Sequence, residues 1–171
     1  MTNEPQEGSR VGDASEALAV ALRAIVGIPC KRSLATNSIK FRFDFRLDDK
    51  GRAYIWIDPP WRLTLAGELV SGSADWPVWD GVEDKEVNQP LWEEWCARFD
   101  LLDPATLSDV SVDRGCPDIR LRFESGHILE TFGNSTHGCW WYYWDRLTGE
   151  VFAAGSAGIS REFAEPADGL P

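Results

Sequence analysis

The sequence predicts an α+β fold made mainly of antiparallel β-sheet: two four-stranded β-meander repeats related by a pseudo-two-fold axis and packed with two short helices. Three observations lead to this prediction. Two segments have apolar residues at helical spacing, several short segments alternate apolar with polar residues, and one alternating pattern occurs twice, around 39–73 and 119–156. Alternation with a period of two buries one face of a strand and leaves the other in water. Because neither copy can bury its apolar face alone, we expect the copies to pack together.

The first predicted element is a helix over residues 14–26. Asp13-Ala14-Ser15-Glu16 has the form of a capping box, and Gly27 suits the end of a helix. The apolar residues that follow at helical spacing are Leu18, Leu22, Ile25 and Val26. We expect this stripe to pack on a sheet, and we expect the polar residues 1–12 to be a disordered tail.

The first copy of the repeated pattern begins at Ile39. Its apolar members are Ile39, Phe41, Phe43 and Phe45, and its polar members are Lys40, Arg42, Asp44 and Arg46. The turn residues Asp48-Asp49-Lys50-Gly51 and a second alternating segment over 53–57 predict a hairpin. Beyond Asp58-Pro59-Pro60, strands are predicted over 61–65 and 68–71.

The second copy repeats these features in the same order. Ile119–Phe123 matches Ile39–Phe43, Gly126 matches Gly51, and Trp141 stands 80 residues after Trp61. The segment 147–152 resembles 65–70, and Gly155-Ser156 resembles Gly72-Ser73. Such self-similarity predicts an internal duplication.

A segment of different character separates the two copies. Pro90 fits the start of a helix, and the apolar residues on one helical face after it are Leu91, Trp92, Trp95, Cys96 and Phe99. We predict a short helix over 90–98 and then a connector. The expected organisation is a single domain over 13–163, with repeat one at about 28–73, an acidic helical insert at 74–108, repeat two at about 109–163, and a disordered tail over 164–171.

The order of these features resembles an uncharacterised family of small bacterial proteins with duplicated β-repeats. The matching residues are Val26-Gly27, Phe123-Glu124-Ser125-Gly126-His127-Ile128-Leu129, Trp141 and Ala157-Gly158, within about Leu22 to Ile159. The first turn departs from the family pattern, because Phe43 to Gly51 is longer than its usual turn. The resemblance carries no catalytic residues. It implies a similarity in kind to immunity proteins found beside polymorphic toxins.

The net charge of −11 narrows the classes of partner. It repels nucleic acid and anionic membranes, so we expect neither as a partner. It favours a basic protein, and the family resemblance implies a cognate toxin. The start of the chain has no basic region followed by an apolar run, which predicts a cytoplasmic protein. We expect either a monomer or a homodimer.

The residues that could support catalysis or bind metal are few. The four cysteines, Cys30, Cys96, Cys116 and Cys139, have no C-x-x-C spacing and are expected to be free thiols. Cys116, His137 and Cys139 could hold zinc, or Cys139 and His137 could form a nucleophile, but neither has the usual arrangement. His127 is expected on a strand surface. We therefore predict no enzyme, no cofactor and no metal.

The acidic insert is the first candidate binding site. Between Asp75 and Asp103, nine acidic residues stand against Lys85 and Arg98. The residues predicted to bind a partner are Asp75, Trp76, Trp79, Asp80, Glu83, Asp84 and Glu86. Tryptophan ringed by carboxylates suits a basic partner. The two tryptophans could instead turn inward as anchors.

The aromatic segment Cys139–Trp144 is the second candidate. In a strand, Trp140, Tyr142 and Trp144 share one face and Trp141 and Tyr143 the other. One set can fill the core, and the other is either covered or available to a ligand. The possible ligand-binding residues are Asn134, His137, Trp140, Tyr142 and Trp144. This alternative predicts a small-ligand or carbohydrate-binding module.

Overall fold

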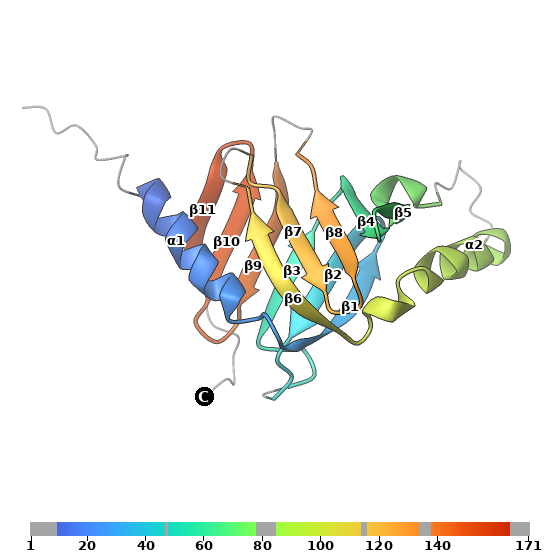
Figure 1. The fold of residues 1–171 in the computed structure, drawn as a ribbon, viewed down its shortest axis with the longest axis horizontal. Coiled ribbons are helices and arrows are strands. Elements are labelled where there is room, and N and C mark those ends of the chain that lie inside the picture. Colours follow the sequence, from blue (N-terminus) through green and yellow to red (C-terminus); the bar gives the residue numbers. More distant parts are fainter. Residues whose placement is uncertain (1–9, 47, 78–84, 114–115, 134–137, 165–171) are drawn as a thin grey trace, which may run out of the picture.

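A computed structural model describes residues 10–46, 48–77, 85–113, 116–133 and 138–164. Within these residues the regular structure is mainly antiparallel sheet, and two α-helices and two short 3₁₀ helices accompany it (Figure 1). The helices are α1 (Arg10–Arg23), α2 (Lys85–Ala97), η1 (Ser73–Asp75) and η2 (Asp100–Leu102). The strands are β1 (Pro29–Ala35), β2 (Ser38–Phe43), β3 (Ala53–Ile57), β4 (Trp61–Leu65), β5 (Glu68–Gly72), β6 (Ala105–Val112), β7 (Ile119–Phe123), β8 (His127–Thr131), β9 (Cys139–Asp145), β10 (Glu150–Gly155) and β11 (Gly158–Phe163).

The strands form two halves that pack face to face. Sheet A has the order β11-β10-β9-β3-β2-β1, and sheet B has the order β6-β7-β8-β4-β5. The two halves join where β1 pairs with β6 through only two residue pairs, Pro29 with Thr106 and Cys30 with Ala105. Phe41 of β2 and Phe123 of β7 meet between the sheets, with ring centroids 5.3 Å apart. The α+β class, mainly antiparallel, is confirmed.

The strands do not form two four-stranded meanders, so this part of the prediction is wrong. β3 pairs with β9 and not with β4, and β4 pairs with β8. Asp58-Pro59-Pro60 turns the chain out of sheet A and into sheet B, where β4 and β5 continue. The reason is that a connection with two prolines cannot form a tight hairpin between β3 and β4.

The alternation predicted for the two equivalent strands is confirmed over Ile39–Phe43 and Ile119–Phe123. It fails beyond Phe43, where β2 ends: Asp44 is buried and Phe45 is only half-buried. Ile39, Phe41 and Phe43 of β2 are fully buried, while Lys40 and Arg42 between them are half-buried. The corresponding core residues of β7 are Ile119, Leu121 and Phe123. Each inner face is apolar because only the alternate side chains point between the sheets.

Helix α1 begins and ends earlier than predicted: it stops at Arg23, so Ile25 and Val26 lie in the turn after it, and Val26 is not part of the core. Leu18, Leu22 and Ile25 join the core together with Ala14. The helix already includes residues 10–13, so Asp13 is not its N-cap and residues 10–12 are not a disordered tail. The remaining residues of that predicted tail, 1–9, lie outside the described part of the chain, as do 165–171 of the second tail. Packing of α1 against β11 and β6 supports its earlier first residue. The local sequence does not reveal these contacts.

Helix α2 closes the end of the sandwich with aromatic side chains. Trp95 and Phe99 are buried against Trp61 of β4, at centroid distances of 6.2 and 5.6 Å. The helix extends from Lys85, so Pro90 lies in its second turn and not at its start, where it was predicted. Strand β6 begins at Ala105, inside the predicted connector, and β1 and β11 were not predicted as strands. No helix among the described residues is long and apolar enough to cross a membrane.

The Phe41–Phe123 contact provides a test of the sandwich. Phe41→Leu and Phe123→Leu should each lower the free energy of unfolding by about 1 kcal/mol. In the double variant the losses should not add, with a coupling of about 0.5–1.5 kcal/mol, because each ring is the other's partner across the sheets.

Urea denaturation of the four proteins measures this cycle. Val20→Ala is the control, since the Val20 side chain is 57% exposed on α1. It should change stability by less than about 0.5 kcal/mol. Additive losses at Phe41 and Phe123 would contradict the face-to-face packing.

Candidate functional site

The outer face of sheet A carries a band of aromatic and basic side chains. The β-sheet register places them in two neighbouring rows. One row runs Lys40, Trp56, Tyr142, and the other runs Lys31, Arg42, Tyr54, Trp144. We call these seven residues the aromatic face.

The four rings of the aromatic face touch across the seam between β3 and β9. Trp56 and Tyr142 are nearly parallel, with an interplanar angle of 14° and centroids 6.3 Å apart. Tyr54 meets the rings of Tyr142 and Trp144 edge-on at 5.7 and 5.5 Å. Tyr54 is buried, whereas the other three rings remain partly exposed. Mutual contact fixes the rings, so little side-chain entropy remains to be lost when something binds them.

The basic residues of the aromatic face have no carboxylate partner within ion-pair distance among the described residues. Lys40 Nζ lies 3.8 Å from the centroid of the Tyr54 ring and 5.9 Å from that of Trp56, and Lys31 Nζ lies 4.9 Å from that of Phe45. Burial, followed by the positive charges of Arg42 and Arg146, lowers the pKa of Lys40 below its ordinary value of 10.5. Cation–π contacts therefore replace ion pairs here.

One carboxylate, Asp58, borders the aromatic face at the end of β3. It accepts hydrogen bonds from Trp56 Nε1 at 2.7 Å and from the Ser38 hydroxyl at 2.6 Å. These bonds hold the Trp56 ring in place. The face as a whole keeps an excess of positive charge, although the chain carries −11.

Neither helix covers the aromatic face. Helix α1 crosses β10 and β11 on the side where sheet B lies, so it covers the inner face of sheet A (Figure 1). Its buried residues belong to the same core cluster as Tyr143 and Phe152. As far as the described residues go, the outer face of sheet A is therefore open to a ligand or partner.

From Trp141 onward the aromatic strand β9 divides as its alternation predicts, whereas Trp140, predicted to share a face with Tyr142 and Trp144, belongs to the core cluster. Trp141 and Tyr143 are in the core, and Tyr142 and Trp144 lie on the aromatic face. Trp140 is buried because its ring packs on the backbone of Gly133, where an added Cβ would come within 2.4 Å of the ring. Asn134 and His137 lie outside the described residues. Tyr54 and Trp56, which complete the face, were not predicted as site residues, since only strand pairing brings β3 beside β9.

The acidic insert is described only in part. Trp79, Asp80, Glu83, Asp84 and the side chain of Glu86 lie outside the described part of the chain. Trp76 packs edge-on against Trp92 and Trp95, at centroid distances of 4.8 and 5.3 Å. Asp75 accepts hydrogen bonds from the Ser71 hydroxyl and the Gly72 N–H, both at 3.0 Å. Asp75 thus holds the η1 turn that follows β5, and Trp76 turns inward as an anchor against α2.

The four cysteines are free, as predicted. Burial raises the pKa of each thiol, that of Cys30 to about 12, so all four are protonated near neutral pH and are poor nucleophiles. Among the described residues, no group of three or more His, Cys, Asp or Glu side chains could hold a metal ion.

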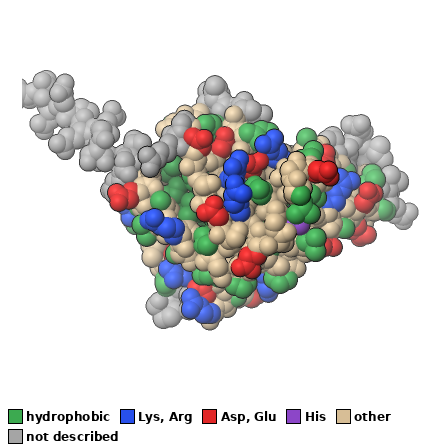
Figure 2. Space-filling view, in the orientation of Figure 1, with side chains coloured by type: hydrophobic (Ala, Val, Ile, Leu, Met, Phe, Trp, Pro, Cys, Tyr) green, Lys and Arg blue, Asp and Glu red, His purple; other side chains and the backbone are tan. Residues whose placement is uncertain are grey.

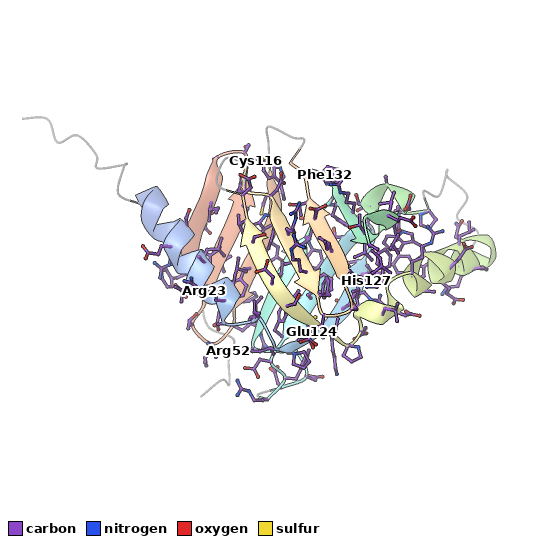
Figure 3. All side chains as sticks on the ribbon, viewed as in Figure 1. Arg23, Arg52, Cys116, Glu124, His127 and Phe132 are labelled. Atoms are coloured by element: carbon purple, nitrogen blue, oxygen red, sulfur yellow. The ribbon has the colours of Figure 1, made fainter. Side chains whose placement is uncertain are left out.

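His127 was expected on the surface, but it is buried. Its Nδ1 lies 2.9 Å from the Ser125 hydroxyl, and it begins β8 at the end of the strand opposite Phe132 (Figure 3). The prediction failed because His127 points between the sheets, in register with Leu65. The polar character of histidine suggests a position on the surface, and it does not reveal that His127 shares the inner face of β8 with Leu129.

No protein-family model, curated protein or solved structure matches this chain. Its function therefore has to be inferred from its surfaces.

The environment of Lys40 gives a measurable expectation. Arg42→Gln should raise the pKa of Lys40 part of the way toward 10.5, because a nearby positive charge is removed while burial, the larger cause, remains. The NMR shift of the ¹³C-labelled Lys40 side chain, followed against pH, measures this. A pKa that is unchanged or lower in the variant would contradict it.

The lowered pKa of Lys40 also determines whether its contribution to stability rises or falls with pH. The unfolded chain keeps Lys40 protonated to higher pH than the folded chain, so it binds more protons between the lowered pKa and 10.5. The contribution of Lys40 to stability should therefore rise with pH through that interval, and Lys40→Met should remove this rise.

Proposed function

We propose that this chain is a non-catalytic binding protein that docks a protein partner on the aromatic face. The observation that carries the proposal is the rigid cluster of Tyr54, Trp56, Tyr142 and Trp144. Its basic neighbours have no carboxylate partner in the described part of the chain. Tryptophan, tyrosine and arginine are the residues that most often dominate the energy of protein interfaces.

The charges indicate what kind of surface would fit. The net charge of −11 attracts a basic partner over long range, with a reach of about 10 Å set by salt. At contact, Lys31, Lys40 and Arg42 need carboxylates or carbonyl oxygens opposite them. A partner that is basic overall and presents a local acidic or carbonyl-rich patch satisfies both conditions.

An immunity-type protein that blocks a basic bacterial toxin is the form of this function that we propose. Toxins that attack nucleic acid carry positive charge, and an acidic blocker gains in association rate from that charge. The exposed carboxylates at the α2 end, such as Glu93, Glu94 and Asp100, would add to this attraction.

A small-ligand or carbohydrate-binding module is the second candidate, and it would use the same face. The near-parallel rings of Trp56 and Tyr142 favour it, because paired rings can contact the apolar side of a flat ligand. Asn134 and His137 stay predicted members of such a site.

We further propose that the two β-repeats arose by duplication and are related by a pseudo-two-fold axis. The strand order supports this. Replacing β1–β5 by β6–β10, and the reverse, converts the order β1-β2-β3-β9-β10 of sheet A into the order β6-β7-β8-β4-β5 of sheet B. Strand β11 and the helices would then be additions to the repeated unit.

Substitution of Trp56 tests the docking face. Trp56→Ala should weaken binding to the product of the neighbouring gene by about thirtyfold, the cost of removing one hot-spot side chain. Calorimetric titration measures the affinity, and co-expression measures protection from toxicity. Ile128→Ala, on the outer face of sheet B, is the matched control and should keep the affinity within about threefold.

Three outcomes decide between the candidates. Full affinity in folded Trp56→Ala, with loss in Glu93→Lys/Glu94→Lys, would place the contact at the α2 end instead. A saturable change of tryptophan emission with a glycan or metabolite would favour the ligand-binding module. No association and no protection by the wild-type chain would reject the immunity role.

A further inference from the structure

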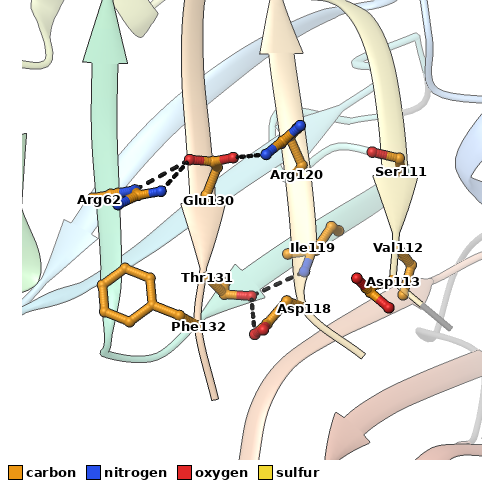
Figure 4. Close-up of a pocket in the computed structure, with 10 residues that line it drawn as sticks. All are labelled: Arg62, Ser111, Val112, Asp113, Asp118, Ile119, Arg120, Glu130, Thr131 and Phe132. Atoms are coloured by element: carbon orange, nitrogen blue, oxygen red, sulfur yellow. Dashed lines mark hydrogen bonds and ion pairs between the residues drawn. The ribbon is translucent and has the colours of Figure 1, made fainter. Parts of the chain in front are cut away.

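The outer face of sheet B contains a polar hollow of about 450 Å³ on the side of the molecule opposite the aromatic face (Figure 4). Acidic and basic side chains are interspersed over the surface on this side (Figure 2). The hollow spans four strands, and its side chains form two rows. Arg62, Glu130 and Arg120 make one row, and Phe132, Asp118 and Asp113 make the other.

The first row presents two fixed guanidinium groups. Arg62 Nε and Nη2 donate to Glu130 Oε2 at 3.1 and 3.0 Å, and Arg120 Nη2 pairs with Glu130 Oε1. The Glu130 side chain is only 14% exposed, while both arginines are about half exposed. One carboxylate cannot neutralise two guanidiniums, so this row keeps one positive charge and N–H donors that face the hollow.

The second row presents two carboxylates on neighbouring strands. Asp118 Oδ1 accepts hydrogen bonds from the Gly133 N–H at 2.7 Å and the Thr131 hydroxyl at 3.1 Å, and that hydroxyl accepts from the Ile119 N–H at 2.9 Å. The Asp113 N–H donates to the Asp118 carbonyl at 3.0 Å, which brings Asp113 alongside. The carboxylate of Asp118 is therefore held by one backbone N–H and one hydroxyl.

An exposed ring borders the hollow at one end of the second row. Phe132 is 41% exposed, and the guanidinium carbon of Arg62 lies 5.7 Å from its centroid. It offers an apolar contact beside both charged rows. Side chains two residues apart on a strand are separated by about 6.8 Å. A ligand that meets both rows must carry its opposite charges several ångströms apart, with an apolar stretch between them.

We propose that this hollow binds a small zwitterionic ligand of the amino-acid or short-peptide class. Its carboxylate pairs with Arg62 and Arg120, its ammonium group pairs with Asp118 and Asp113, and its alkyl part lies against Phe132. The volume falls within the range of small-molecule sites. A lysine side chain with a free α-carboxylate has the required separation of charges. This site does not depend on the docking function proposed for the aromatic face.

Three probes that differ in one charge each test the proposal. Nα-acetyl-lysine carries both charges, its methylamide lacks the carboxylate, and Nα,Nε-diacetyl-lysine lacks the ammonium group. In NMR titrations followed by ¹H–¹⁵N correlation spectra, Nα-acetyl-lysine should shift the amide resonances of Ile119 and Gly133 in a saturable manner. Each blocked probe should bind at least about tenfold more weakly, because one charge-assisted contact is lost.

Matched variants separate the hollow from its surroundings. Asp118→Asn keeps the acceptor for Gly133 and Thr131 but removes the charge, and Arg120→Gln removes one guanidinium. Each should weaken Nα-acetyl-lysine at least about tenfold. Arg122→Gln, on the same strand face but outside the hollow, should bind as the wild-type chain does. The absence of saturable shifts, equal binding of the blocked probes, or an equal loss in Arg122→Gln would each overturn the proposal.

Discussion

The pairing of β3 with β9, and of β4 with β8, is the constraint on which the rest of the structure depends. Each pairing joins the first half of the chain to the second, so neither half can complete a sheet alone. Residues 58–60 carry the chain from one sheet to the other, and β1 and β6 add only a two-residue link. The inner faces must then pack on each other, because each is lined by fully buried residues such as Phe41 and Leu121. The apolar core and the exchange of strands therefore depend on each other.

Both candidate sites lie on the seams that this exchange creates. Trp56 and Tyr142 face each other next to the Ile57–Trp141 pair, and Glu130 and Arg62 face each other next to the Thr131–Trp61 pair. If the halves are duplicates, as we propose, these are equivalent positions in the two sheets. The β3–β9 pairing then carries aromatic side chains, and the β4–β8 pairing carries ion-paired side chains. Core positions on the inner face must stay apolar, whereas outer positions are free to diverge. Divergence at the seams would give one scaffold two different binding surfaces.

The distribution of charge gives each surface a distinct role. The chain carries −11, yet the basic residues of the aromatic face have no ion-pair partner among the residues that the structure describes. The cation–π contacts of Lys31 and Lys40 leave both able to meet an anionic group. On sheet B, Glu130 already pairs with Arg62 and Arg120, so the arginines are positioned before any ligand arrives. Preorganised side chains lose little entropy on binding. The thiols, in contrast, are protonated by burial and serve packing more than reactivity. The chemistry that these surfaces suit is recognition.

The sequence by itself determined several of the strands and the faces of their side chains, because alternation is a local property, but it did not reveal β1 or β11. The bounds of β3, β4 and β7, and the division of β9 into Trp141 and Tyr143 inside and Tyr142 and Trp144 outside, could all be predicted. It did not determine which strands would pair, since pairing depends on contacts far apart in the chain. Tyr54 and Trp56 therefore joined the candidate site only when β3 was placed beside β9, and the row of Arg62, Glu130 and Arg120 had no signal in the sequence. The predicted meanders failed, and His127 proved buried, for the same reason. Tertiary structure decided the neighbours of each strand, because burying both inner faces at once stabilises the exchanged pairing over the local one.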